Sequence, residues 1–415
     1  MQQAPRGTAD ILPERQRYWS FVQSTLTDAA LAFGYARIDT PVFEDTRLFT
    51  RTVGVETDIV QKEMYTFEDR AGQSLTLRPE GTAAVCRAYI EHGLHNQAQP
   101  VRYYYLCPMF RYDRPQAGRY RQFHQFGVEA IGDGGATVDL EVIQLAMHSM
   151  ERLGLGGMTL ALNNIGDAQD RPRYLDALRE HFAPHRAHMG ADDRRRFETS
   201  PLRLLDSKEL AGESFMETAP RSIDYLAAEA QAHWDELLGH LDAIGLPYRL
   251  DHKLVRGLDY YTRTVFEVHP SREGAQSAVC AGGRYDGLIE QIGGRPTPGI
   301  GFAAGVDRMI LNLEEQGAEP PEAAPPPLVV AYRGEAAKSA AIRLAIAVRA
   351  EGGRALVAPD RSLKAQLRYA SGIGAPDVLI LGDAELAKGV ATHRDMAAGE
   401  QREIPLADAP RLLLR

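Results

Sequence analysis

Cysteine, tryptophan and long apolar runs are all scarce in this sequence. Its three cysteines, Cys86, Cys107 and Cys280, lie far apart, and no pair has the spacing of zinc ligands, so a disulfide framework is not expected. No apolar run approaches the roughly 20 residues that a membrane-spanning helix needs. No apolar segment follows the first basic residue near the N-terminus, which is unlike a secretory signal. We therefore expect a cytoplasmic protein that does not enter a membrane.

A positive charge excess and the common nucleotide-binding loops are also missing. The net charge of −9 argues against a surface that grips nucleic acid everywhere, although it is compatible with a local basic face. No G-x-x-x-x-G-K-[ST] segment occurs, so any ATP site has to be built from arginines on a sheet surface. Gly299, Gly301 and Gly305 lack the G-x-G-x-x-G spacing and a preceding βαβ context, which excludes the usual dinucleotide site.

The 415 residues are too many for one ordinary core and predict two or three domains. The clearest boundary is the proline-rich segment QGAEPPEAAPPP, residues 316–327, which favours an extended linker. We expect a large domain over residues 1–315 and a smaller module over residues 328–415. In the module, the apolar segments LVVAY, ALVAP and VLILG alternate with helical segments, which predicts a small parallel α/β sheet.

The N-terminal part predicts an α+β domain. It opens with a helix whose apolar residues recur at helical spacing, among them Trp19, Val22 and Leu26, and continues into ARIDTPVFE, a predicted strand that carries Pro41. Strand patterns then crowd together in VRYYYLC, MFRYD, RQFHQFGVEAI, MTLALNN, YTRTVFEV and SAVCAGG, which indicates a mainly antiparallel sheet with helices packed against it. Between about residues 167 and 240 helical patterns replace the strands, so we expect a helical insertion there.

The segment FRYDRPQAGRYRQFHQFGVEAIG predicts two antiparallel strands joined by a loop. On the return strand Phe123, Gln125 and Glu129 have one parity, whereas His124 and Phe126 have the other. A glutamine and a glutamate buried on one face need polar partners, which a polar ligand would supply. Taken alone, this strand is better explained as an edge strand whose polar face meets water. The interpretation as a ligand site therefore depends on two further segments.

Two further segments place arginines beside strands. The pattern LVRGLDYYTRTVFEV puts Tyr261, Arg263 and Glu267 on one face and Arg256 before a glycine turn. An arginine there suits phosphate or carboxylate oxygens, and half of a structural salt bridge is the alternative. GIGFAAG predicts a strand that runs into a helix, with Arg308 in the first helical turn. A cation at that position opposes the helix dipole, which favours an anionic partner.

Together, these segments resemble the signature motifs of class II aminoacyl-tRNA synthetases, and within that class the histidyl-tRNA synthetase family. ARIDTPVFE resembles the first motif, FRYDRPQAGRYRQFHQFGVEAIG the second and PGIGFAAGVDRMIL the third. LRPEGT and LVRGLDYYTRTVFEV are similar to the two segments that distinguish the histidine enzymes, and SLKAQLRYASGIGAPDVLILGDAELAKG is similar to their anticodon-binding domain. The resemblance covers nearly the whole chain.

The resemblance implies a fold and an activity. The fold would be an antiparallel-sheet catalytic domain with a helical insertion, followed by an α/β anticodon-binding domain. The activity would be that of an enzyme that uses ATP to activate L-histidine as its adenylate and then transfers histidine to the 3′ end of tRNA(His). The first motif also implies a homodimer.

The resemblance further implies a histidine site. A carboxylate and a phenol that face the two imidazole nitrogens would discriminate against side chains that leave those groups unpaired. The residues implied for histidine are Glu80, Thr82 and Gln125 around the ammonium group, Glu129, Tyr260 and Tyr261 around the imidazole, and Arg111 and Arg256 beside the reacting groups.

The implied catalytic residues are three arginines. Arg111 and Arg308 match the family arginines that grip the α- and γ-phosphates of ATP, and Arg256 matches a histidine-specific arginine near the α-phosphate. Together with Mg²⁺ ions, they would stabilise the charge that accumulates on the phosphoryl oxygens. The sequence names no protein ligand of the metal. The implied ATP contacts are Arg111, Asp113, Arg119, Phe123 and Arg308, and the implied contacts of the tRNA acceptor end are Gln116, Arg119 and Arg121.

The sequence departs from the family pattern at two positions, and two other functions were considered. Asp113 and Asp307 stand where glutamate is common, which shortens each side chain by one methylene. The main alternative is a catalytically inactive paralogue that serves as the regulatory subunit of ATP phosphoribosyltransferase. Such paralogues typically lose the segment of Arg256 and the anticodon-binding module, and both are present here. A synthetase for threonine or proline is disfavoured by the RGLDYY segment.

Overall fold

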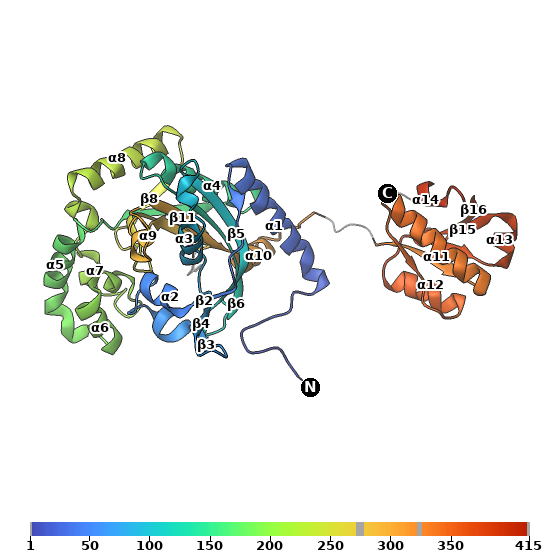
Figure 1. The fold of residues 1–415 in the computed structure, drawn as a ribbon, viewed down its shortest axis with the longest axis horizontal. Coiled ribbons are helices and arrows are strands. Elements are labelled where there is room, and N and C mark those ends of the chain that lie inside the picture. Colours follow the sequence, from blue (N-terminus) through green and yellow to red (C-terminus); the bar gives the residue numbers. More distant parts are fainter. Residues whose placement is uncertain (1, 271–277, 322–325, 413–415) are drawn as a thin grey trace. The chain divides into compact units, whose positions relative to one another are not determined.

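The chain divides into two units, Met1–Pro320 and Pro321–Arg415, in the computed structural model (Figure 1). The structure describes residues 2–270, 278–321 and 326–412. Within these ranges no helix has both the length and the apolar character that a membrane span requires.

An eight-stranded sheet is the framework of the first unit. Neighbouring strands are antiparallel except at the two edges, where β1 pairs with β5 and β7 pairs with β8 in parallel. The expectation of an α+β domain with a mainly antiparallel sheet is therefore confirmed. In spatial order the strands are β1 (Ala36–Arg37), β5 (Val101–Phe110), β6 (Gln122–Ile131), β11 (Gly299–Gly305), β10 (Cys280–Arg284), β9 (Thr262–Pro270), β7 (Met158–Asn164) and β8 (Tyr248–Leu250).

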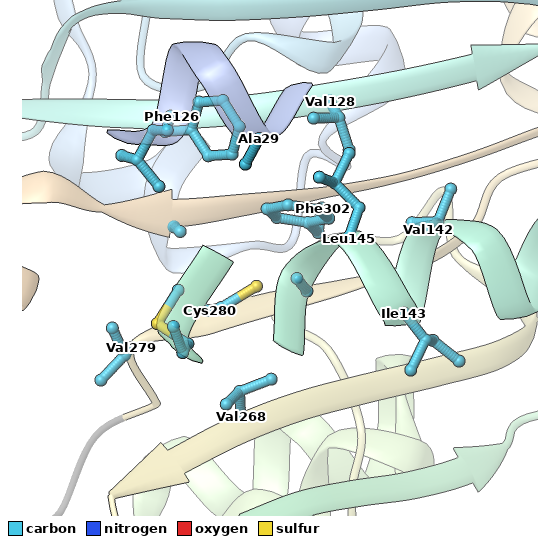
Figure 2. Packing of buried hydrophobic residues seen from close by; sticks show 14 of the residues in the cluster. Ala29, Phe126, Val128, Val142, Ile143, Leu145, Val268, Val279, Cys280 and Phe302 are labelled. Carbon is cyan, nitrogen blue, oxygen red and sulfur yellow. The ribbon is translucent and has the colours of Figure 1, made fainter. Parts of the chain in front are cut away.

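One face of this sheet carries the main hydrophobic core (Figure 2). Phe126 and Val128 of β6 and Phe302 of β11 pack there with Leu145 of the helix α4, and the Phe126 and Phe302 rings lie 5.7 Å apart. Since strand residues alternate between faces, side chains of the other parity must point to the opposite side of the sheet. The helices of this core are α1 (Pro13–Ala32), α4 (Ala136–Arg152), α8 (Ala228–Ala243) and α10 (Val306–Glu315).

The opposite face carries a second hydrophobic cluster, to which Cys86, Leu178 and Leu288 contribute. Figure 1 shows α5, α6 and α7 gathered on one side of the first unit, away from α1. The remaining helices are α2 (Thr46–Thr52), α3 (Thr82–Glu91), α5 (Arg171–Phe182), α6 (Ala191–Thr199), α7 (Ser214–Glu217) and α9 (Leu288–Gln291), and short helical turns cover Ile59–Glu63, Leu94–Asn96, Ala183–His188, Pro201–Asp206 and Ser222–Tyr225. A small antiparallel sheet contains β2 (Phe43–Asp45), β4 (Ser74–Leu77) and β3 (Tyr65–Glu68).

The second unit is built on a five-stranded sheet in the order β13-β12-β14-β15-β16. β12, β13 and β14, which match the three predicted strands, are parallel, so that prediction is confirmed, while β15 and β16, which were not predicted, pair antiparallel. The sequence of this terminal hairpin is largely polar and partly exposed, and it therefore lacks the apolar run of a buried parallel strand. The elements are β12 (Leu328–Tyr332), α11 (Glu335–Ala350), β13 (Ala355–Val357), α12 (Leu363–Gly372), β14 (Asp377–Leu381), α13 (Asp383–Lys388), β15 (Val390–Asp395), β16 (Gln401–Pro405) and α14 (Ala409–Leu412).

Two strand predictions differ from the structure because of proline. ARIDTPVFE is not one strand, since β1 and β2 belong to different sheets and Pro41 lies between them. VRYYYLC and MFRYD, in contrast, merge into the single strand β5, which runs through Pro108. β1 pairs with β5 only at Tyr103 and Tyr104, so the missing N–H of Pro108 costs no ladder bond on that side.

Two further predictions concern segments that lie partly outside the described residues. Of SAVCAGG, Ser277 lies outside the described residues and β10 begins at Cys280. In the predicted linker, residues 322–325 lie outside the described part. Its first residues remain attached to the first unit, because Ala318 donates its N–H to Leu313 and accepts from the Tyr18 hydroxyl at 3.3 Å.

Candidate active site

A cavity of about 490 Å³ opens on the face of the sheet opposite the main core. Arg111, Arg256 and Arg308, predicted from three distant stretches of the chain, all line it. The β6 parity prediction is confirmed, since Phe123 and Gln125 line the cavity while Phe126 packs in the core behind. Other predicted residues that line the same cavity are Glu80, Thr82, Asp113, Arg119, Tyr260 and Tyr261.

Arg111 and Arg308 are held by backbone carbonyls. Arg111 follows β5, donates from Nε to the Pro79 carbonyl at 2.8 Å, and its guanidinium carbon lies 5.5 Å from the Phe123 ring centre. Arg308 lies in the first turn of α10 and donates to the carbonyls of Gly118 (3.2 Å) and Ala278 (2.6 Å). Carbonyl oxygens orient a guanidinium but do not neutralise its charge, so both arginines keep a net charge for an anionic ligand.

The positive charges are close enough to affect one another. Burial lowers the pKa of Arg308, and the neighbouring guanidinium groups of Arg119 and Arg111 lower it further. Burial likewise lowers the pKa of Arg111. Like charges gathered in a partly desolvated cavity are unfavourable unless an anion joins them, which is the arrangement that a polyphosphate requires.

Arg256 has a different environment. Its guanidinium forms an ion pair with Glu267 of β9 and lies 5.6 Å from the Tyr261 ring centre. Although burial favours the neutral acid, His269 and Arg256 lower the pKa of Glu267, so the pair is ionised. The Arg256 Nε is buried and has no hydrogen-bond partner within the described ranges, which leaves a donor for a ligand.

Glu80, Thr82 and Gln125 lie at the start of α3 and on the neighbouring β6. Glu80 accepts from the backbone N–H groups of Thr82 (2.7 Å) and Ala83 (3.0 Å), so its carboxylate caps the helix. An ionised carboxylate has about four acceptor positions, so Glu80 can still accept from a ligand. The buried Oε1 of Gln125 has no partner in the part of the chain that the structure describes, which is unusual unless a ligand supplies one.

Glu129 lies beneath the cavity and is not among the residues that line it. Its side chain has no exposed surface, and Thr82 Oγ1 donates to its Oε1 at 2.7 Å. Burial raises the pKa of Glu129 to about 8, although hydroxyl donors oppose this shift. Tyr260 and Tyr261 lie closer to the opening, with ring centres 4.7 Å apart.

The loop between β5 and β6 holds the residues predicted to contact tRNA. Arg119 pairs with Asp113 at 3.2 Å, and Gln116 and Arg119 exchange backbone hydrogen bonds of 3.1 and 2.9 Å. Arg121 does not line the cavity, since its guanidinium stacks 3.8 Å from the ring centre of Tyr112 and donates to the Asp113 carbonyl at 3.3 Å. The loop therefore presents Arg119 to the cavity and Arg121 to one side of it.

The prediction for Arg263 is wrong. It was placed on the face of Tyr261 and Glu267, but its φ of 48° and the register shift opposite Gly283 and Arg284 break the alternation of β9. Arg263 instead pairs with Asp167 (3.0 Å) and Glu229 (2.7 Å), outside the cavity. Arg263 is therefore part of a structural salt bridge and not of the site.

Several residues that line the cavity were not predicted from the sequence. Tyr105 lies directly opposite Gly127 on the neighbouring strand, so a cross-strand register would have revealed it. The charged segments of the helical region match no sequence motif, so the sequence did not indicate that their residues line the cavity. The polar lining residues that the sequence did not single out are Asp58, Glu63, Tyr105, Tyr120, Arg196, Arg203, Asp206, Lys208 and His269.

The described residues contain no cluster of three or more His, Cys, Asp or Glu side chains that could hold a metal ion. Mg²⁺ commonly takes only one or two protein carboxylates and completes its shell with phosphate and water oxygens. Carboxylates of Glu63, Asp113 and Glu267 line the cavity, so the residues present fit an ion of this kind when it arrives with a triphosphate. Asp307 also lines it, but accepts from the backbone N–H of His124 at 2.7 Å.

Comparisons with known proteins agree with this geometry. The family model "Histidyl-tRNA synthetase" matches residues 7–309, and "Anticodon binding domain" matches residues 328–415. A histidine–tRNA ligase of Dehalococcoides mccartyi is 52% identical over 98% of this chain and 97% of its own length, and one of Desulforamulus reducens is 46% identical over 97% of each. A crystal structure of apo S. aureus histidyl-tRNA synthetase is 39% identical, with a TM-score of 0.83 over 99% of both chains. The chain belongs to the histidyl-tRNA synthetase family of class II aminoacyl-tRNA synthetases.

Proposed function

We propose that this cavity binds histidine and ATP together and aligns them for adenylate formation. As a member of its family, the chain is an aminoacyl-tRNA synthetase that ligates histidine to tRNA with ATP as the energy source. The observation that carries the assignment of the site is the convergence of Arg111, Arg256 and Arg308 on one cavity that also contains the unpartnered Gln125 oxygen.

The histidine subsite is assigned to the end of the cavity near α3. The ammonium group would be held by Glu80, Gln125 and Thr82, where a carboxylate and an amide oxygen offer acceptors. The imidazole would lie among Glu129, Tyr260 and Tyr261. Glu129 is buried below the residues that line the cavity, so an imidazole N–H that approaches it would be desolvated. Such a site would discriminate strongly against amino acids whose side chain cannot form this hydrogen bond.

The ATP subsite is assigned to the arginine-rich end. Arg111 and Arg308 would bind the α- and γ-phosphates, and Arg256 would bridge the α-phosphate and the histidine carboxylate. The carboxylate oxygen attacks the α-phosphorus in line, the bond to the bridging oxygen breaks, and pyrophosphate leaves. Positioned guanidinium groups stabilise the charge that grows on the phosphoryl oxygens without a covalent enzyme intermediate. Phe123, Asp113 and Arg119 would complete the ATP contacts.

Magnesium is proposed as the metal that accompanies ATP. When bound, it supplies positive charge that neutralises phosphate oxygens. Glu63, Asp113 and Glu267 are the carboxylates in reach of the cavity that would hold it with the triphosphate.

The second half-reaction requires tRNA(His) beside the same cavity. The terminal adenosine hydroxyl attacks the adenylate carbonyl, and AMP leaves with the electron pair of the broken anhydride bond. The loop with Gln116, Arg119 and Arg121 would receive the acceptor end. Arg121, which stacks on Tyr112 and does not line the cavity, would contact a phosphate that does not enter it.

We also propose a homodimer, a cytoplasmic location and the domain limits 1–315, 316–327 and 328–415, with a helical insertion over about 167–240. The dimer proposal is supported by exposed apolar side chains on the small sheet that includes the end of the first motif. Phe43 is 49% exposed and Phe67 is 43% exposed, with ring centres 6.2 Å apart. An exposed aromatic pair of this kind is typical of a surface that a partner covers.

Histidine-dependent exchange of labelled pyrophosphate into ATP tests the proposal. We expect exchange by the unaltered protein and a loss of about 100-fold or more for Arg256→Ala, because a donor to the transition-state oxyanions is removed. Arg256→Lys should recover only part, since it cannot offer two parallel donors. Arg249→Ala, which alters an exposed arginine paired with Asp251, is the control. Histidine binding without exchange would contradict the assigned activity, and a fully active Arg256→Ala would remove Arg256 from its role.

The regulatory alternative is not proposed. The paralogue was expected to lack both the segment of Arg256 and the anticodon-binding module. Arg256 is present and lines the cavity, and a family model of anticodon-binding domains matches residues 328–415.

A further inference from the structure

Three hydroxyl groups surround the carboxylate of Glu129. Thr82 Oγ1 from α3 lies 2.7 Å from Oε1, and the Tyr105 hydroxyl from β5 lies 3.3 Å from the same oxygen. The Tyr285 hydroxyl lies 2.5 Å from Oε2. Each carboxylate oxygen therefore has at least one hydroxyl donor, and all four side chains are buried.

Tyr285 is distinct among these groups because it does not line the cavity, whereas Thr82 and Tyr105 do. It follows β10, its backbone N–H donates to the Gly299 carbonyl at 2.8 Å, and its ring covers Gly299 so closely that a Cβ there would overlap it. A phenol held in this way can reach Glu129 from below while leaving the upper side of the carboxylate toward the cavity.

The space for the Glu129 and Tyr105 side chains depends on three glycines. A Cβ at Gly301, on the neighbouring strand β11, would overlap the Glu129 carboxylate. Cβ atoms at Gly81 and Gly127 would both overlap the ring of Tyr105. These three glycines thus leave a slot that the Glu129 carboxylate and the Tyr105 ring fill, and a packed interior resists even small displacements of either.

The hydroxyls also decide which protonation state the slot favours. Hydrogen bonds to an ionised carboxylate stabilise the charged form, and burial without them would strongly favour the neutral acid. Burial raises the pKa of Glu129, and Tyr285 is the largest of the influences that lower it, followed by Thr82. Some titratable groups shift the pKa of Glu129, and others have their own pKa shifted by its charge. They include Tyr35, Glu80, Cys86, Tyr105, Tyr260, Tyr261 and Tyr285.

We propose that Tyr285 is a positioning residue for histidine recognition: its phenol, with Thr82 and Tyr105, holds the Glu129 carboxyl group as an acceptor aimed at the imidazole N–H. This inference rests on the proposed role of Glu129 as the imidazole contact. Tyr285 does not touch the substrate. It acts through Glu129, so it determines histidine affinity and its pH dependence and leaves ATP binding alone.

Tyr285→Phe tests the inference in the full-length protein. In pyrophosphate exchange we expect the KM for histidine to rise by about tenfold, which corresponds to the lower range for a hydrogen bond to a charged group, while the KM for ATP stays within twofold. In profiles of kcat/KM for histidine against pH, the acidic limb should move to higher pH by about one pH unit. Titration of the free histidine imidazole contributes equally to both profiles, so the difference between them reports Glu129.

Tyr174→Phe is the matched control. Tyr174 is also buried in the second hydrophobic cluster, and its hydroxyl donates to the Pro220 carbonyl at 3.1 Å, so the change removes one buried phenol bond without touching Glu129. We expect this variant to keep the histidine KM and the pH profile of the unaltered protein. An equal shift in both variants would mean that Tyr285 has only a structural role.

Glu129→Gln separates failure of this inference from failure of the proposed function. It should raise the KM for histidine by at least as much as Tyr285→Phe and flatten the acidic limb. An unchanged histidine KM in Glu129→Gln would overturn the assigned imidazole contact and the inference with it. A large effect of Glu129→Gln together with a Tyr285→Phe profile that matches the unaltered protein would overturn the role of Tyr285 alone.

Discussion

Arg284 and Asp139 form an ion pair of 2.6 Å in which neither side chain has any exposed surface. Arg284 ends β10 and Asp139 lies in the first turn of α4, so the pair joins the sheet to the helix that covers its main core. Arg284 also donates to the carbonyls of Asp133 (3.2 Å) and Gly135 (2.9 Å). Tyr285 is the next residue along the chain, so this anchor also fixes the backbone from which Tyr285 reaches Glu129.

We predict that Arg284→Met lowers the free energy of unfolding by about 3–5 kcal/mol, because it leaves the Asp139 carboxylate buried without its guanidinium partner. Urea unfolding followed by tryptophan fluorescence measures the change. The sequence has two tryptophans, Trp19 and Trp234, and both pack in the main core, so the signal reports the first unit. Arg15→Met removes the exposed pair with Glu314 and should cost less than about 1 kcal/mol. Similar losses in the two variants would contradict the prediction.

His233 predicts a pH dependence of stability. It is 7% exposed, its Nε2 lies 3.5 Å from Asp139, and burial together with the Arg284 guanidinium lowers its pKa to about 4. The unfolded chain takes up a proton below about pH 6.5, whereas the folded protein resists it until about pH 4, so stability falls as the pH decreases through this window. Between pH 7 and 5 this group accounts for a loss of up to about 2 kcal/mol.

The measurement is the difference in unfolding free energy between pH 7 and pH 5 for the unaltered protein and for His233→Gln. Carboxylates that do not contact His233 titrate equally in both proteins, so their contribution cancels. His240→Gln, at a more exposed histidine beside Glu236, is the control and should retain the full pH dependence. A His233→Gln protein that loses as much stability as the unaltered one would show that His233 does not titrate in this window.

The positions of the arginines and the parity of β6 were predictable because both depend on short periodic patterns. GIGFAAG leads directly into α10, so Arg308 was expected in the first turn, where it is found. Alternation along β6 likewise separated Gln125 from Phe126. Such features need only local rules of strands and helix starts.

The residues that were missed or misplaced depend on long-range packing. The bulge that turns Arg263 away from the cavity arises from how β9 and β10 pair, which a single strand pattern does not contain. Tyr285 reaches Glu129 across a separation of 156 residues, and Arg203 reaches Asp259 across 56. Neither contact has a motif of its own, because each results from where the chain folds back.

Arg203 ties the helical region to the segment that carries Arg256. It donates to the carbonyls of Glu56 (3.1 Å) and Gly257 (3.4 Å) and pairs with Asp259 at 2.7 Å. We predict that Arg203→Ala lowers pyrophosphate exchange by about tenfold, because Arg256 is then held less firmly beside the phosphate, and misplacement of such a group is costly.

A double-mutant cycle distinguishes this route from a general loss of structure. If Arg203 acts through Arg256, Arg203→Ala should have little further effect on exchange in the Arg256→Ala background. Arg195→Ala, at a more exposed arginine in α6, should leave exchange unchanged. Fully additive effects of Arg203→Ala and Arg256→Ala would exclude the proposed connection.

Gly127 is required by the ring of Tyr105, its cross-strand neighbour. A Cβ on Gly127 would overlap the end of that ring, and a Cβ on Gly81 would overlap it as well, so the ring packs closely against both positions. We predict that Gly127→Ala lowers the free energy of unfolding by about 1–3 kcal/mol through overpacking and also raises the KM for histidine, because Tyr105 helps to hold Glu129. Tryptophan fluorescence in urea and pyrophosphate exchange measure the two effects.

A second substitution at Tyr105 should distinguish the effect of Gly127→Ala on stability from its effect on histidine binding. The double change Gly127→Ala with Tyr105→Leu removes the overlap and should recover much of the stability, but the histidine KM should stay high because the hydroxyl is gone. Gly239→Ala in α8, where a Cβ would meet nothing within 4 Å, should be neutral or stabilising by up to about 1 kcal/mol. If Gly127→Ala instead matched Gly239→Ala in stability, the ring of Tyr105 would have room to move, which would contradict the prediction.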